Sequence, residues 1–457
     1  MHRYRWIAQG WNCVAVLLLA GCAIPSSREN LDATARLVST QTAAPLLWRR
    51  DAQAERQARA NVESMLADGL TLDEAITVAF LASPELQLAL EQLEISRSQF
   101  VAAATPPNPV AIVGEREPGG NLSAFYPGRN VTVGVLQNLI GLLNMPDRRA
   151  VARRDLDRAR YEAASRITQF GARVAQAWLE YSAALRIAEV RRSSLTATQA
   201  VLENQQTASP SSPQNLQTLR AGVINTTGSV LRNGLDVATA REKLGLLLGL
   251  EGWHDDWQIS GTLPALPAAD FDAGKQEGAA LEKRLDVQPA ARAVDTRLRV
   301  LAMQRHFRWL NQFDLGLFRD RAIGGTAFTG PNAVIELPLF DQRQAQLLNA
   351  DAELRAAMRT LESSRLNARA EIRTHAAEMS VTRALLEHNE RNVIAVQRQA
   401  TVTLAANENA SEMDRLRVRQ ALLATEEDQV GLLRDYWRAR SALAVSLGDW
   451  PSAQLPR

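Results

Sequence analysis

A cluster near the middle of the chain holds residue types that bind metals. Trp253, His254, Asp255, Asp256 and Trp257 follow one another directly, and imidazole and carboxylate groups are common zinc ligands. The ligands of one metal ion must converge in space, which immediate neighbours in a sequence rarely achieve alone. We therefore expect no metal site here. The cluster is instead predicted to belong to a belt-like segment that packs around the outside of the structure, with the tryptophan rings as anchors.

The other candidates for chemistry are isolated. His306, His375 and His388 stand alone along the chain and are predicted to lie on helix surfaces. The sequence contains no nucleophile elbow, phosphate-binding loop or metal-ligand spacing. We therefore predict no catalytic residue, no cofactor and no enzymatic activity.

Cys22 lies in a context typical of lipid attachment. A basic start precedes a short apolar run that is too short to span a bilayer and ends in LAGC, residues 19–22. This ending resembles a bacterial lipobox, in which the cysteine becomes the first residue of the mature chain and carries the lipid. Residues 1–21 are then a signal peptide, and Ala23 rather than Asp after the cysteine implies the outer membrane. An ordinary signal peptide with an incidental Cys22 is the alternative.

Bulk composition narrows the class of protein. The 457 residues carry a net charge of +2, which argues against a nucleic-acid partner. Hydrophobic residues make up 46% of the chain and aromatic residues only 5%, a mixture suited to closely packed helices. No stretch after residue 22 is typical of a transmembrane helix, so a membrane crossing would require a β-barrel.

The chain contains a weak internal duplication. The segment SPELQLALEQLEISRSQF from Ser83 aligns with RLDVQPAARAVDTRLRVL from Arg284, and VTVGVLQNLI from Val131 aligns with PNAVIELPLF from Pro331. The order of the elements agrees as well as the residues. We therefore interpret the halves as repeats, with chance similarity between Ala-rich helices as the alternative.

Each half is predicted to contain a helix followed by a pair of strands. The helices are expected over 72–104 and 286–310. The strands are expected over 109–117 and 130–137, then 312–319 and 332–339, and apolar residues alternate along them with the period of a sheet. Val131, Val133 and Val135 are predicted to oppose Thr132 and Gly134, and Phe313, Leu315 and Leu317 to oppose Asp314 and Gly316. The connecting loops hold Phe125, Tyr126 and Phe328.

Two long helical hairpins follow the strand pairs. Their arms are predicted over 147–209 and 214–250 in the first half, and over 342–405 and 411–447 in the second. A sustained seven-residue spacing of apolar residues predicts coiled-coil packing. The heptad positions are Ile167, Val174, Tyr181, Ala188, Leu195 and Leu202; Leu216, Val223, Val230, Val237 and Leu244; Ile372, Met379, Leu386, Val393 and Ala400; and Leu416, Leu423, Val430, Trp437 and Ala444.

These elements are incomplete in one copy of the chain. Four strands cannot close a barrel, and their edges would expose unpaired backbone groups that a membrane does not tolerate. Several chains sharing one barrel would remove those edges. The long helices would then continue the tube away from the membrane.

The combination resembles the TolC-type outer-membrane efflux channel family, including its lipoprotein members. IELPLFDQRQAQ, from Ile335, is similar to the strand-to-helix corner of that family. LAANENASEMDRLRVRQALL, from Leu404, is similar to its second hairpin tip and the start of its last helix. The likeness extends from about Leu70 to Gly448.

The resemblance implies a homotrimer with a shared twelve-stranded β-barrel and an α-helical tunnel in the periplasm. It implies a passive exit duct that works with a periplasmic adaptor and an inner-membrane transporter, and that contacts outer-membrane lipid. The expected parts of the chain are a signal peptide (1–21), a lipidated extended segment (22–70), a first repeat (71–250, strand pair 109–137), a linker (251–283), a second repeat (284–448, strand pair 312–339) and a tail (449–457).

The second hairpin tip departs from the family pattern. Leu404 and Asn407 stand where an aromatic residue and a glycine are usual, and Asn407 is expected to adopt the left-handed conformation of that glycine. The resemblance places a periplasmic gate at Asp414 and Arg417, where the family often has two acidic residues. We therefore expect Asp–Arg pairing at the gate; a solvated carboxylate favoured by the helix dipole is the alternative for Asp414.

Two other functions stay open. An exit duct for a type I protein secretion system would have the same architecture, and the sequence does not identify the exported substrate. A structural coiled-coil lipoprotein of the envelope would explain the heptads and the lipid, but not the strand pairs.

Overall fold

The computed structural model describes residues 24–39, 46–116, 130–207, 213–250, 257–270, 273–322, 327–407 and 409–450. The chain divides into two compact units. The first contains Met1–Ala33, Gln92–Tyr161 and Gln288–Ser363; the second contains Thr34–Glu91, Glu162–Val287 and Ser364–Arg457.

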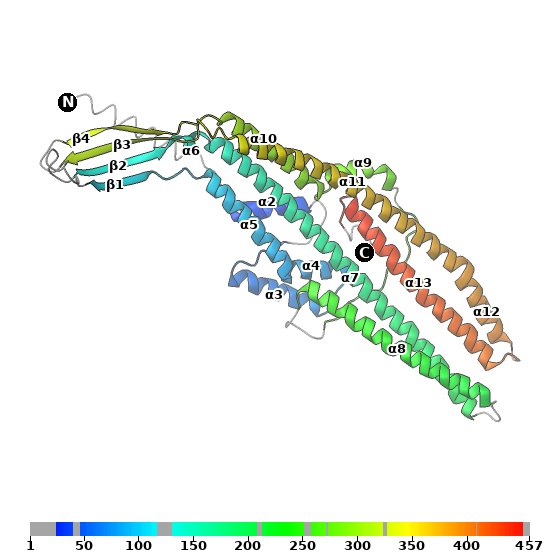
Figure 1. The fold of residues 1–457 in the computed structure, drawn as a ribbon. Coiled ribbons are helices and arrows are strands. Elements are labelled where there is room, and N and C mark those ends of the chain that lie inside the picture. Colours follow the sequence, from blue (N-terminus) through cyan, green and yellow to red (C-terminus); the bar gives the residue numbers. More distant parts are fainter. Residues whose placement is uncertain are drawn as a thin grey trace. The chain divides into compact units, whose positions relative to one another are not determined.

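The first unit contains a four-stranded antiparallel sheet (Figure 1). Its strands are β1 (Val110–Arg116), β2 (Asn130–Asn138), β3 (Phe313–Ala322) and β4 (Ala327–Ile335), in the order β1-β2-β3-β4. The predicted β4, 332–339, was placed too late. Ala327 to Gly330 already pair with β3, and Pro338, which lacks an N–H group, lies beyond the strand end. Phe328 therefore belongs to β4 and not to the loop.

Short helices flank the sheet in this unit. They include α6 (Leu139–Leu143), α10 (Val287–His306) and most of α5 (Pro84–Ala104). Two small apolar clusters stabilise them, one around Phe100 and Leu156 and one around Leu301 and Leu354. Helix α2 (Ser27–Ser39) precedes these elements in the sequence.

The helix predicted over 72–104 is two helices. Helix α4 (Leu72–Ala82) begins with a capping box between Thr71 and Glu74, and α5 begins at Pro84. Ser83 between them has φ −64° and ψ 127°. A residue before proline is disfavoured in the helical region, which explains the break.

The long arms were predicted to within two residues at every end. They are α7 (Met145–Thr207), α8 (Pro213–Leu248), the run α11 (Gln344–His388), η3 (Asn389–Ile394, a π-helix) and α12 (Ala395–Ala406), and finally α13 (Glu412–Ser446). Every predicted heptad position is buried or half-buried. The remaining elements are α3 (Ala52–Leu66), η2 (Ala273–Lys275) and α9 (Glu277–Lys283).

The main apolar core lies in the second unit. Helix α4 buries nearly its whole surface there, with Phe80 against Phe170 of α7 and Trp450 near the chain end. Tyr436 and Trp437 of α13 are completely buried in the same core. Trp450, the second residue of the predicted tail at 449–457, is thus anchored in this core.

Two glycines occupy corresponding places in the halves. Gly249 follows α8 with φ +68°, and Gly448 follows α13 with φ +82°. A Cβ atom on Gly249 would lie 2.9 Å from the Ala82 oxygen and 2.9 Å from the Ser83 Cα; one on Gly448 would lie 3.4 Å from the Lys283 Cβ. Ser83 aligns with Arg284 in the sequence, so each glycine lies beside the corresponding position of the proposed repeats.

Candidate functional site

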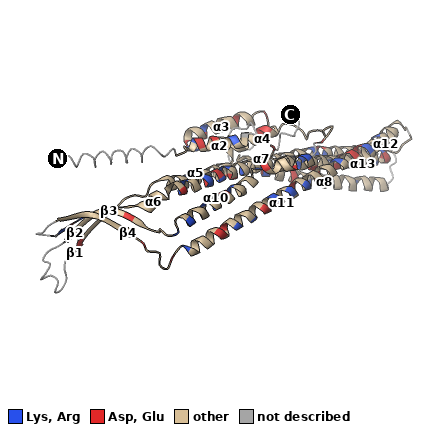
Figure 2. Cartoon of the chain, turned by 90° about the horizontal axis from the view of Figure 1, so that it is seen from above, with Lys and Arg blue, Asp and Glu red and all other residues tan. Residues whose placement is uncertain are grey.

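The sheet has one strongly apolar face. The register places on one side the residues that make up what we call the apolar face: Ala111, Val113, Val131, Val133, Val135, Leu315, Leu317, Ala333 and Ile335, with the charged Glu115, Arg319 and Arg321 on the same side near one end. These side chains are exposed; Val113 is 76% exposed and Leu317 is 56% exposed. The predicted alternation of β2 and β3 is confirmed. Strands β2 and β4 contain no Asp, Glu, Lys or Arg, whereas β1 and β3 contain charged residues, as the helices do (Figure 2).

The opposite face of the sheet is rich in glycine and polar groups. Gly114, Gly134, Gly316 and Gly330 all lie on this glycine-rich face. The Phe318 ring lies over Gly134, where a Cβ atom would approach the ring to 2.7 Å. The Thr132 hydroxyl donates a hydrogen bond of 2.5 Å to Asp320. Glycines along one face permit a sheet to curve.

Both edges of the sheet are open. Within the described residues, β1 pairs only with β2 and β4 pairs only with β3. The side chains of β4 are exposed along the strand except at Gly330. Such edges are normally paired, covered or protected by charge.

An apolar corner lies where the sheet joins the helices. We give this name to Trp309, Leu337, Leu339 and Phe340, which are 56%, 72%, 71% and 91% exposed. Asn311 connects the two segments, because its amide donates to Glu336 at 3.2 Å and its oxygen accepts from Arg343 at 2.6 Å.

The predicted gate residues form an ion pair within the chain. Asp414 and Arg417 lie in the first turns of α13, with a guanidinium–carboxylate distance of 3.3 Å. Both side chains are more than half exposed. An exposed pair of this kind contributes at most about 1 kcal/mol to stability.

The conformation predicted for Asn407 is wrong. Its φ is −88° and its ψ is 105°, which is extended and not left-handed. The tip turn is held by hydrogen bonds instead: the Asn407 side chain accepts from the Asn409 N–H at 3.0 Å, and Arg415 donates to the carbonyls of Leu404 and Asn407. The basic residue that stabilises the turn was not predicted from the sequence.

The other predicted residues are distributed over several places. Cys22, Phe125, Tyr126 and Trp253 to Asp256 lie outside the described residues. His306, the last residue of α10, lies edge-on to the adjacent Phe307, His375 contacts Glu378 within α11, and His388 at the end of α11 contacts Asn392 of η3. Among the described residues no group of His, Cys, Asp and Glu could hold a metal ion. None of the described helices has the length and apolar composition needed to cross a membrane.

Residues 257–270 pack along the helices of the second unit. Trp257 is 7% exposed and lies edge-on to Tyr181, and Ile259 forms a parallel bridge with Leu70. The Trp437 indole donates to the Pro264 carbonyl at 2.8 Å. One predicted anchor, Trp257, therefore packs as expected.

A second anchor of this segment was missed. The Asp270 carboxylate accepts from Tyr436 at 2.5 Å and from Arg440 at 2.7 Å, and pairs with Arg383 at 3.2 Å. Arg383 also donates to the carbonyls of Pro267 and Ala268. Nothing in the local sequence distinguishes Asp270 from Asp272; only the packing of α11 and α13 assigns its role.

The Tyr436 hydroxyl makes stability depend on pH. Burial and the hydrogen bond to Asp270 raise its pKa from 10.0 to about 12, against the opposing effect of Arg440. The neutral phenol therefore contributes stability that is complete below pH 10 and is lost as the pH rises towards 12. We expect this loss to be about 2–3 kcal/mol. Denaturant unfolding of Tyr436→Phe at pH 9 to 12 should show a smaller decrease than the parent; an identical decrease would contradict this assignment.

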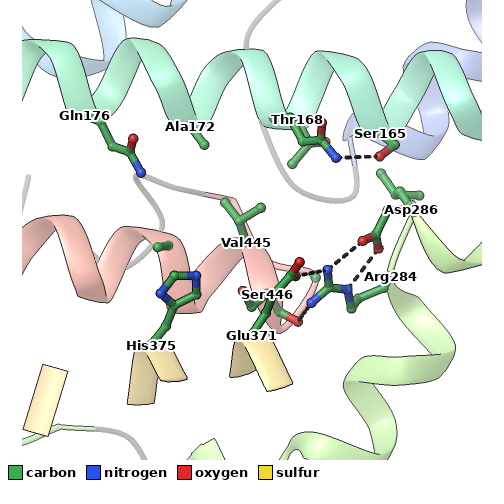
Figure 3. A pocket seen from close by; sticks show the side chains of 14 residues that line it. Ser165, Thr168, Ala172, Gln176, Arg284, Asp286, Glu371, His375, Val445 and Ser446 are labelled. Carbon is green, nitrogen blue, oxygen red and sulfur yellow. Dashed lines mark hydrogen bonds and ion pairs between the residues drawn. The ribbon is translucent and has the colours of Figure 1, made fainter. Parts of the chain in front are cut away.

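Arg284 joins three segments at a polar pocket (Figure 3). Its guanidinium, 7% exposed, binds Asp286 at 2.5 and 2.9 Å and Glu371 at 2.5 Å, and donates to the Ser446 carbonyl at 3.2 Å. Burial lowers the pKa of Arg284, but Asp286 and Glu371 outweigh it and raise the pKa above its usual value. The pocket of about 260 Å³ is polar, and its buried charge is satisfied by protein groups.

The comparisons with known proteins concern the fold. No protein-family model matches the chain, and no curated protein matches it. The Campylobacter jejuni CmeC outer membrane channel is similar over 82% of this chain and 85% of its own, with 12% identity and a TM-score of 0.70. The Neisseria gonorrhoeae MtrE outer membrane channel, in its open state, is similar over 83% and 89%, with 14% identity and a TM-score of 0.69. The Vibrio cholerae outer membrane protein VceC is similar over 83% and 96%, with 16% identity and a TM-score of 0.68.

These likenesses agree with the predicted mainly helical fold and its four-stranded antiparallel sheet. The chain therefore has the fold of the outer-membrane channels, as its resemblance to the TolC-type family predicted.

Proposed function

We propose that this chain is the outer-membrane channel of a tripartite efflux system. Three copies share a twelve-stranded barrel, and their helices form a tunnel in the periplasm. The channel is a passive exit duct that meets a periplasmic adaptor and an inner-membrane pump, and a lipid on Cys22 attaches it to the membrane.

The observation that carries this proposal is the incomplete sheet. It combines an exposed apolar face, a glycine-rich opposite face and two open edges. Exposed apolar surface of this extent is costly in water and favourable in lipid, but lipid does not tolerate open edges. Pairing β1 of one copy with β4 of the next satisfies both conditions. Strands of seven to ten residues are close to the length that a tilted membrane strand needs.

Disulfide crosslinking between copies tests this arrangement. Within one chain, β1 and β4 are separated by two strands, about 14 Å, which is beyond disulfide reach. We expect Val113→Cys, combined in turn with Ala327→Cys, Thr329→Cys and Ala333→Cys, to give covalent trimers after oxidation in at least one pair. Each single variant is the matched control. A complete absence of crosslinked trimers across the scan would contradict the shared barrel.

Different observations distinguish the two alternative functions from the efflux channel. An exit duct for secreted polypeptides would use the same wall and tunnel, so the neighbouring pump and adaptor distinguish it from an efflux duct. A structural envelope lipoprotein has no need of an exposed apolar sheet. The fold also resembles channels and not enzymes, in keeping with a protein without catalytic activity.

We further propose that Asp414 and Arg417 form part of the periplasmic gate. Their ion pair lies at the exposed start of α13, where copies in a trimer would approach one another. Losing either side chain is expected to raise the open probability of single channels because the closed tip loses charge pairing. Single-channel recordings of Asp414→Ala and Arg417→Ala test this. Unchanged opening in both variants would refute the gate.

A further inference from the structure

Two arginines interrupt the apolar face of the sheet. Arg319 and Arg321 lie on β3 on the same side as Leu317, and the register places them opposite Val133 and Val131. Both are exposed, and in the part of the chain that the structure describes neither forms a hydrogen bond or ion pair. The presence of these two cationic groups on an otherwise largely apolar face therefore requires an explanation.

Both arginines lie at one end of the strands. The strand ends nearest to them lead into residues 117–129 and 323–326, whereas the opposite ends lead to the helices and the apolar corner with Trp309. From Phe313 to Arg321 β3 rises about 27 Å, or about 20 Å along a membrane normal at a tilt of about 40°. Trp309 lies beyond Phe313, so the apolar corner and the arginines bracket a band close to the 25 Å expected for a membrane barrel.

The ionisable residues of the apolar face all lie in one part of it. Its helix-side part contains Leu315, Ala333 and Ile335 and no ionisable group, whereas its loop-side part contains Arg319, Arg321 and the carboxylate of Glu115. The described residues of this face thus leave one net positive charge, and Arg319 and Arg321, two residues apart on one side of β3, have Cα atoms about 6.8 Å from each other. Planar guanidinium groups bind phosphate oxygens with paired hydrogen bonds.

We propose that Arg319 and Arg321 bind the phosphate of a phosphorylated glycolipid in the outer leaflet. This inference rests on the proposed membrane position of the sheet. Near the headgroups an outward-facing arginine costs little, about 0–1 kcal/mol, against about 2–4 kcal/mol at the bilayer centre. Each copy in the trimer offers one such pair, and the apolar side chains below it contact the acyl chains of the same lipid.

Lipid binding by the full-length protein tests the site. The probes are lipid A with its phosphates and the same lipid after dephosphorylation, each in phosphatidylcholine nanodiscs, with bound lipid counted by native mass spectrometry. We expect Arg319→Gln/Arg321→Gln to weaken binding of the phosphorylated probe about tenfold or more, since it removes charge-assisted hydrogen bonds. Arg299→Gln/Arg305→Gln removes two exposed charges from α10 and should leave binding unchanged.

Three outcomes would overturn the inference. They are equal binding by both double variants, equal binding of the dephosphorylated probe, and full competition by millimolar inorganic phosphate, which would indicate a general anion site. Conductance in pure phosphatidylcholine bilayers separates this inference from the proposed function. A parent protein that conducts but does not prefer phosphorylated lipid refutes only the lipid site, and a parent that never conducts refutes the channel.

Discussion

Replacing Leu317 by arginine is expected to abolish membrane assembly. Leu317 lies at the middle of the apolar face, in the row of Ala111, Val135 and Pro331. An arginine facing lipid costs about 2–4 kcal/mol at the bilayer centre and less towards the headgroups, so three copies in one barrel lose up to about 6–12 kcal/mol. Membrane fractionation and native gel electrophoresis should show the variant absent from the outer membrane as an assembled trimer.

Asn332→Arg is the matched control for Leu317→Arg. Asn332 lies one residue further along β4 than Pro331, on the glycine-rich face, so it introduces the same group at nearly the same height. We expect this variant to assemble and to change only conductance and ion selectivity. Equal loss of assembly in both variants, or normal assembly of Leu317→Arg, would contradict the assignment of the two faces.

Removing both counter-charges of Arg284 is expected to produce the largest loss of stability in the helical part. In Asp286→Asn/Glu371→Gln the guanidinium stays buried at 7% exposure without a carboxylate. An uncompensated buried charge costs about 3–5 kcal/mol. Chemical unfolding of the detergent-solubilised protein measures this change.

Two further variants make the test specific. Glu277→Gln removes a carboxylate whose partners Arg369 and Arg373 are 52% and 72% exposed, and we expect a change below about 1 kcal/mol. Adding Arg284→Met to the double variant should restore much of the lost stability because the unpaired charge is then gone. A double variant no less stable than Glu277→Gln would refute the role of Arg284.

The sequence predicts the repetitive features well. Seven-residue spacing locates α7, α8 and α13, and alternation assigns Val133 and Leu317 to one face. These signals repeat over many residues, so single exceptions do not hide them. The ends of elements that lack a periodic signal are harder to predict from the sequence. The break between two helices at Ser83 depends on a single proline, and the start of β4 was predicted too late because apolar residues alternate only weakly along it.

The polar contacts of the core could not be predicted in the same way. Arg284 binds Glu371 and the Ser446 carbonyl across 87 and 162 residues, and Asp270 binds Arg440 across 170. Such partners depend on which helices become neighbours, and no local spacing indicates this. The turn at Asn407 shows the same dependence on contacts that local sequence does not reveal. A left-handed Asn407 was predicted, but Arg415 and the Asn407 side chain stabilise the turn with Asn407 in an extended conformation.

Planar-bilayer conductance combined with subunit counting tests the channel most directly. Full-length protein, purified in detergent and added to one side of a bilayer, should produce stepwise currents, and the conducting species should crosslink as three chains. A protein that stays monomeric in detergent and never conducts would contradict the account.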